Sequence, residues 1–150
     1  MIQPEPTFVD TNVLVHAHDP VRSTVARALL ETLWVSRRGV LSTQVLQEFY
    51  AVATRELRPV MPKAQARAIV AAYGEWCEVS TDPLLIVSAS RPEEDHSLSF
   101  GNALIVEAAL RSGARRLVSE DLQDGRRFGD LVGENPFAGP EDRRSGLPKA

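Results

Sequence analysis

Two short apolar segments near opposite ends of the chain each lead into an aspartate, and this pair constrains the fold more than any other feature. Residues 8–9 lead directly to Asp10, and residues 117–118 lead through Ser119 and Glu120 to Asp121. Short apolar runs bounded by turn-forming residues are typical of buried strands. In open α/β sheets, ligands bind at the C-terminal ends of the strands. The sequence therefore predicts that Asp10 and Asp121 converge at one edge of a sheet.

Hydrophobic periodicity predicts that helices and strands alternate along the rest of the chain. Strands are expected at residues 7–10, 39–41, 77–79, 116–119 and 131–132, and helices at residues 13–18, 20–37, 43–57, 62–76, 83–91 and 99–111. This alternation favours a parallel sheet with helices on both faces. We therefore predict an α/β fold with a central parallel sheet flanked by helices.

The length of 150 residues suits one domain with a hydrophobic core and is too short for two ordinary domains. We expect a single domain over residues 1–137, followed by a loose tail over residues 138–150, which is polar and rich in Pro and Gly. The sequence has neither a long apolar run nor a signal-like N-terminus, so we expect no membrane association. Cys77 is the single cysteine, which excludes an internal disulfide and favours a cytoplasmic location.

The formal net charge of −3 provides no general attraction to nucleic acid, although acids that bind a metal would account for part of it. The basic residues are mostly arginine, which makes bidentate contacts with phosphate. Coding bias is an alternative explanation for this preference. The candidate phosphate contacts are Arg22, Arg27, Arg126 and Arg127.

Two further polar side chains are expected on helices. Glu48 falls at the border of the apolar stripe of its helix, and Asn102 lies in the first turn of a helix that Ser99 would cap. Oxygen ligands suit magnesium, but an asparagine lacks the charge that this ion prefers. Each residue also has a structural alternative, because aspartates cap turns and a border glutamate is usually a surface residue. Together with Asp10 and Asp121, they predict a Mg²⁺ or Mn²⁺ site.

Two histidines and three aromatic residues could suggest catalytic or base-stacking roles, but each has a simpler structural explanation. His16 and His18 are spaced so that they fall on different faces of a helix, which favours surface roles or supporting roles beside a site. The aromatic residues Trp34, Phe49 and Trp76 are expected in the core or in a subunit interface, and not as platforms for stacking bases.

Five segments, taken in order and at this spacing, resemble the PIN-domain family, specifically the VapC-type toxins of bacterial toxin–antitoxin systems. These segments are residues 9–14, 44–50, 98–105, 117–125 and 135–137, and the similarity extends from Thr7 to Phe137. The resemblance implies a Rossmann-like α/β domain and a magnesium- or manganese-dependent endoribonuclease. It also implies a homodimer, an RNA substrate and a cognate antitoxin whose C-terminal segment lies in the active-site groove.

The resemblance also implies roles for individual residues. The metal-binding positions of the family correspond here to Asp10, Glu48, Asn102 and Asp121. Of these, the three carboxylates would be catalytic. Supporting roles fall to Thr11 and Asn12, which would orient Asp10, and to Ser119, which would lie beside Asp121.

Position 102 departs from the family pattern, which usually has an aspartate there after an aromatic residue. Here Gly101 and Asn102 occupy these two positions. Asp95 lies too far upstream to replace the missing acid, whereas Asp124 is a better candidate for a supplementary ligand that acts through water.

Three functions therefore remain open from the sequence. The first is an active ribonuclease toxin. The second is a catalytically weakened PIN domain that binds RNA or an antitoxin, because Asn102 replaces the usual aspartate. The third is a phosphatase with Asp10 as nucleophile, but that chemistry would need a second acid two residues later, where Asn12 stands.

Overall fold

The computed structural model of the chain describes residues 5–21 and 23–139. Arg22 and residues 140–150, which include most of the expected tail, lie outside the described residues.

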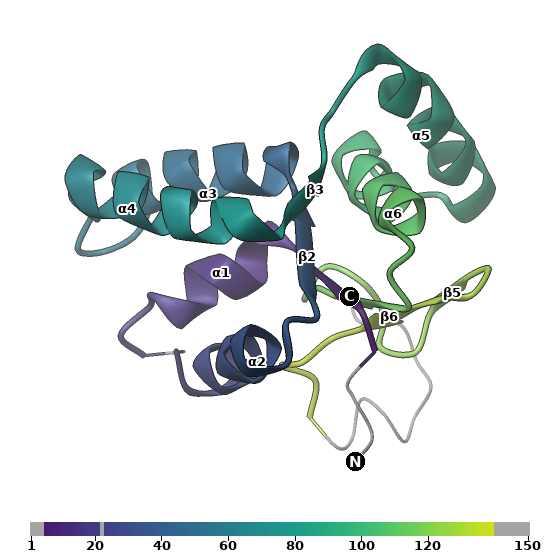
Figure 1. Ribbon diagram of the computed structural model, residues 1–150. Coiled ribbons are helices and arrows are strands. Elements are labelled where there is room, and N and C mark those ends of the chain that lie inside the picture. The colour runs from purple at the N-terminus through teal and green to yellow at the C-terminus, as the bar shows by residue number, and fades with distance from the viewer. Residues whose placement is uncertain (1–4, 22, 140–150) are drawn as a thin grey trace.

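A six-stranded sheet forms the centre of the molecule (Figure 1). In spatial order, its strands are β3 (Cys77–Val79), β2 (Gly39–Ser42), β1 (Thr7–Val9), β4 (Arg116–Val118), β6 (Leu131–Glu134) and β5 (Arg127–Phe128). Neighbouring strands are parallel except β5 and β6, which form an antiparallel edge. The predicted α/β fold with a parallel sheet is confirmed. The sequence did not predict β5, because a two-residue strand is too short to show periodicity.

In the part of the chain that the structure describes, six α-helices and one short 3-10 helix surround the sheet. They are α1 (Thr11–Ala17), α2 (Ser23–Ser36), α3 (Thr43–Arg55), α4 (Lys63–Tyr73), η1 (Gly74–Trp76), α5 (Pro83–His96) and α6 (Phe100–Ser112). Helix α3 packs against α1 and α4, and α5 packs against α6, so two helical hairpins project from the sheet (Figure 1). Within the described ranges, no helix combines the length and apolar character that a bilayer-spanning segment requires.

Helix α5 is longer than the sequence predicted, because it continues through Pro92 instead of ending before it. A proline inside a helix removes one backbone hydrogen bond. Pro92 is buried, and α5 packs along α6, so burial and packing outweigh that loss.

The core lies where the strands meet the inner faces of the helices. Phe8, Leu117 and Phe49 are completely buried, as expected for central strands and for the apolar stripe of α3. The other two predicted core aromatics differ, because Trp76 is buried but Trp34 is 36% exposed and packs on Trp76 with ring centroids 4.7 Å apart. A Cβ at Gly39 would lie 2.5 Å from the Trp76 ring, so only glycine fits under this indole.

Candidate active site

The register of the two central strands brings Asp10 and Ser119 together. Val9 of β1 pairs with Val118 of β4, so the residues that follow are neighbours at the C-terminal edge of the sheet. The Ser119 hydroxyl donates to Asp10 Oδ2 at 2.7 Å, and the Thr11 backbone N–H donates to Asp10 Oδ1 at 2.7 Å. Asp10 is thus the N-cap of α1 and also lines the pocket, so the structural and functional interpretations of this residue are compatible.

A second set of hydrogen bonds fixes Asp121. The Asn12 amide donates to Asp121 Oδ2 at 3.3 Å and to Ser119 Oγ at 3.2 Å, and its own oxygen accepts the Glu120 backbone N–H. The Asp121 backbone N–H donates to Ser119 Oγ at 3.1 Å. Ser119 therefore lies beside Asp121 as expected and also contacts Asp10, whereas Asn12 contacts Asp121 and not Asp10.

Helix α3 places Glu48 at the open side of the site. The Thr11 hydroxyl donates to Glu48 Oε2 at 2.9 Å. The Gln44 amide donates to Glu48 Oε1 at 3.0 Å and to the Gly101 carbonyl at 3.3 Å, which links α3 to the start of α6. Sequence reasoning did not identify Gln44. The available signal was its position one helical turn before Glu48, on the same helix face.

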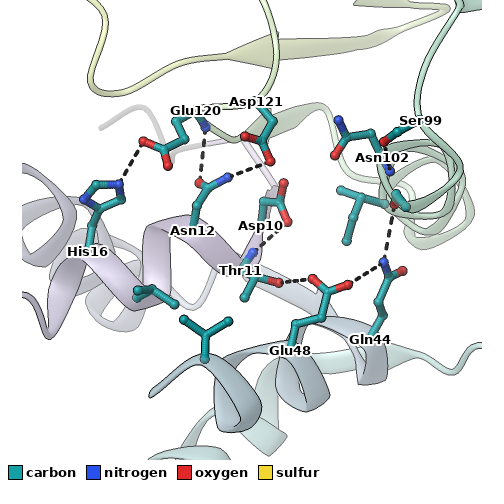
Figure 2. Close-up of a pocket in the computed structure, with 14 residues that line it drawn as sticks. Asp10, Thr11, Asn12, His16, Gln44, Glu48, Ser99, Asn102, Glu120 and Asp121 are labelled. Carbon is teal, nitrogen blue, oxygen red and sulfur yellow. Dashed lines mark hydrogen bonds and ion pairs between the residues drawn. The ribbon is translucent and has the colours of Figure 1, made fainter. Parts of the chain in front are cut away.

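The backbone and the side chain of Asn102 differ in their contacts. Its backbone N–H donates to Ser99 Oγ at 3.2 Å, which confirms that Ser99 caps α6. Its side-chain amide makes no hydrogen bond with any of the described residues, and Figure 2 shows it directed toward Asp10 and Asp121. The amide is therefore available to the pocket.

These side chains line one pocket with a volume of about 330 Å³. The structure brings together all four predicted metal-binding residues, which are Asp10, Glu48, Asn102 and Asp121 (Figure 2). Asp124 does not line this pocket, and its carboxylate accepts the Asn135 backbone N–H at 3.0 Å. Its predicted role as a supplementary ligand stays a prediction.

Glu120 also lines the pocket and was missed by sequence reasoning. Its Oε2 lies 2.8 Å from Nε2 of His16, and the His16 ring packs on Phe137 with centroids 4.4 Å apart. His16 is buried and supports the loop beside the site, which is the second of the two roles expected from the sequence. The contact could be found only in the fold, because His16 and Glu120 are 104 residues apart.

Burial and neighbouring carboxylates raise the pKa values of two acids in the pocket, Asp10 and Asp121. Burial raises the pKa of Asp10 to about 6, and the charges of Asp121 and Glu48 add to this effect, while the hydrogen bonds from Ser119 and Thr11 oppose it. Burial also raises the pKa of Asp121, with contributions from Glu120 and Glu48, and the bond from Asn12 opposes the shift. A cluster that disfavours its own ionisation is stabilised by a bound cation.

The donor set fits a hydrated hard cation. Among residues 5–21 and 23–139, no three His, Cys, Asp or Glu side chains are grouped closely enough to hold one ion by direct coordination alone. Magnesium usually keeps several waters and binds through one or two carboxylates. Asp10 and Asp121 supply such carboxylates, and the Asn102 amide can add an uncharged oxygen.

A family model for the PIN domain matches residues 7–127. The chain belongs to the PIN domain family. The matched range of this PIN domain contains all four predicted metal-binding residues. The family assignment from the sequence is confirmed.

Solved structures with the same fold include toxins and toxin–antitoxin complexes. The PIN domain is similar to VapC20 of Mycobacterium tuberculosis, described as a toxin that cleaves the sarcin-ricin loop, with 22% identity, a TM-score of 0.55, and coverage of 74% of this chain and 86% of that chain. It is also similar to VapBC2 from Rickettsia felis bound to promoter DNA, with 18% identity, a TM-score of 0.57, and coverage of 86% and 97%.

A toxin–antitoxin complex from Klebsiella pneumoniae has 14% identity to the PIN domain, a TM-score of 0.64, and coverage of 87% of this chain and 98% of that chain. Identities this low establish a shared fold. No curated protein matches the sequence.

Proposed function

We propose that this PIN domain is a divalent-metal-dependent endoribonuclease and the toxin of a toxin–antitoxin pair. The observation that carries the proposal is the pocket at the C-terminal edge of the parallel sheet, where Asp10, Glu48 and Asp121 crowd together and two of their pKa values are raised. The similar fold of VapC20, a toxin that cleaves the sarcin-ricin loop, supports the same conclusion.

Each residue of the pocket would contribute a different part of phosphodiester hydrolysis. A bound Mg²⁺ or Mn²⁺ would supply an activated water and neutralise the charge that develops on the phosphate. Asp10 and Asp121 would hold that ion, with an uncharged contact from Asn102. Ser119 and Asn12 keep the two carboxylates in place, and Glu48 would orient a water at the open side of the pocket.

The cognate antitoxin is proposed to act on the same acidic pocket. An arginine from the antitoxin would pair with the crowded carboxylates and relieve their mutual repulsion. The complexes from Rickettsia felis and Klebsiella pneumoniae support a partner of this kind. The homodimer and the cytoplasmic location stay predictions.

A second candidate function rests on the start of α6. Gly101 and Asn102 provide neither the aromatic side chain nor the charge that the family resemblance implies there. A weakened PIN domain would bind RNA or its antitoxin without efficient cleavage.

Cleavage of RNA tests the two candidates. The antitoxin-free protein is incubated with total RNA and Mn²⁺ or Mg²⁺, with EDTA as a blank and Asp10→Asn as the inactive variant. Asp130→Asn is the matched control, because Asp130 is exposed on the β5–β6 turn, away from the pocket. We expect discrete fragments that disappear with EDTA and with Asp10→Asn but persist with Asp130→Asn.

Other outcomes separate the candidates. Cleavage only after Asn102→Asp would support the weakened domain, with a site that lacks one charge. No cleavage by either protein would contradict the ribonuclease proposal and leave a binding role.

A further inference from the structure

Arg55, in the last turn of α3, lies on the helix face that lines the candidate active site. The pocket residues from α3 are Gln44, Glu48 and Val52, which follow one another at intervals of four residues. With about 100° of rotation per residue, Arg55 falls about 20° from the centre of this face, whereas Glu56 falls about 80° from it. Along the helix axis, Arg55 is about 10 Å beyond Glu48.

The direction of helical side chains brings the Arg55 guanidinium back toward the pocket. The Cα–Cβ bonds of an α-helix tilt toward its N-terminus, so a residue covers the turn before its own Cα. For Arg55, this is the turn that contains Val52, which lines the pocket together with Val15 of α1. Figure 2 shows α3 passing under the site, and Glu48 projects from it toward Thr11.

The Arg55 side chain has no partner among the described residues, which sets it apart from the arginines that are held by other groups of the protein. Five arginine side chains donate to a carboxylate or to a backbone carbonyl, namely Arg27, Arg58, Arg111, Arg116 and Arg126. Arg27 and Arg126 were predicted phosphate contacts, and these bonds occupy them. Arg55 is exposed, and no carboxylate or carbonyl among the described residues pairs with its guanidinium.

We propose that Arg55 binds a backbone phosphate of the RNA substrate, on the side of the pocket where α3 ends; this inference rests on the proposed ribonuclease function. A guanidinium forms paired hydrogen bonds with phosphate oxygens. The contact offsets the repulsion between the acidic pocket and the RNA backbone.

The test compares Arg55→Ala and Arg55→Lys with Arg91→Ala. Arg91 is an exposed arginine on α5, so its replacement removes the same charge away from the pocket. Binding is measured by fluorescence anisotropy at several salt concentrations, in the Asp10→Asn background with Mn²⁺. The probe is a labelled mixed-sequence single-stranded RNA of about 20 nucleotides, which exceeds the site sizes common for single-strand binding.

We expect Arg55→Ala to weaken RNA binding about tenfold at low salt, as for the loss of a charged hydrogen bond. The slope of log affinity against log salt should fall by about 0.7, the value for one phosphate contact to a single strand. Arg55→Lys should retain the slope, and Arg91→Ala should change neither quantity. In the active background, KM for RNA should rise while kcat stays within about twofold.

The measurements distinguish a failure of the Arg55 assignment from a failure of the ribonuclease proposal. If the parent protein cleaves RNA but Arg55→Ala and Arg91→Ala give equal affinities and salt slopes, the assignment of Arg55 is overturned and the ribonuclease stands. An equal rise in KM for Arg55→Ala and Arg91→Ala, with no change in the salt slope, also overturns the assignment. If the parent protein neither binds nor cleaves RNA, the proposed function fails and the assignment fails with it.

Discussion

The two sides of the candidate active site are built differently. On the sheet side, hydrogen bonds from Ser119 and Asn12 hold both Asp10 and Asp121. On the α6 side, the Asn102 amide has no hydrogen-bond partner among the described residues, and a Cβ added at Gly101 would meet nothing within 4 Å. The carboxylates of the sheet are held in fixed positions, whereas the helix side contributes an isolated oxygen and open space.

This difference shows where the site tolerates change. Replacing Ser119 or Asn12 on the sheet side breaks hydrogen bonds that hold Asp10 and Asp121. Replacing Asn102 changes the charge of the pocket without breaking a side-chain bond. The departure from the family pattern therefore lies at the position where it costs the fold least.

The largest expected effect concerns the stability of the sheet side and its dependence on pH. The folded-state pKa of Asp10 is raised from 3.8 to about 6, so the protonated form is favoured in the fold. The contribution of Asp10 to stability is therefore full below pH 4 and is lost as the pH rises toward 6. In EDTA, Asp10→Asn should increase the free energy of unfolding by about 2–3 kcal/mol at pH 8.

Thermal unfolding at pH 4 and pH 8 measures this effect. The Tm difference between Asp10→Asn and the parent protein should be larger at pH 8, and Mn²⁺ should raise the Tm of the parent protein more than that of the variant. Equal Tm differences at the two pH values would show that the fold does not raise the pKa of Asp10.

The next effect concerns the α6 side. Asn102→Asp has nearly the same shape and adds a charge where no hydrogen bond must be broken, so the fold should persist. We expect the affinity for Mg²⁺ and Mn²⁺ to increase about 10- to 100-fold, with faster cleavage. Isothermal titration calorimetry measures the affinity, and Asp130→Asn serves again as the remote control. An unchanged affinity would mean that position 102 does not face the ion.

A smaller effect is expected when the sheet side loses one hydroxyl. Ser119→Ala removes the bond that lowers the pKa of Asp10, so this pKa should rise above its present value. Cleavage at neutral pH should fall about tenfold, as for the loss of a residue that orients a metal ligand. The acidic limb of the pH–rate profile should move to higher pH. Ser90→Ala, in which an exposed serine of α5 is replaced, should leave the profile in place.

The smallest effect tests the open space on the α6 side. Gly101 is exposed in the first turn of α6, and alanine has a higher helix propensity than glycine. Gly101→Ala should stabilise the protein by about 0.5 kcal/mol, measured by urea denaturation, with little change in cleavage. A clear loss of activity would show that substrate passes directly over this residue.

The sequence predicted the sheet edge because the signals for it are local. Apolar runs ending at Asp10 and Ser119 identify strands and turns without any knowledge of the rest of the fold. The helix start at Ser99 was also predictable, because a cap lies next to the turn that it stabilises.

Residues whose roles depend on distant contacts were not predictable in the same way. Gln44 matters because it reaches Gly101, which is 57 residues away in the sequence. The partners of Asn12 and Ser119 depend on how two loops meet, and nothing in either segment specifies which side chain reaches which carboxylate. The sequence predicted that the helix beginning at Pro83 ends before Pro92. The tertiary packing that keeps Pro92 inside α5 cannot be inferred from the local sequence.

The hydrogen bond between Asp10 and Ser119 joins residues that are 109 positions apart. During synthesis, β1 is made first, and its neighbour β4 follows only after most of the domain has been made. A nascent chain of this topology therefore has no assembled pocket for most of its translation. For a protein that cleaves RNA as proposed, cleavage can begin only after the segment from Ser119 to Asp121 has been synthesised and has joined Asp10.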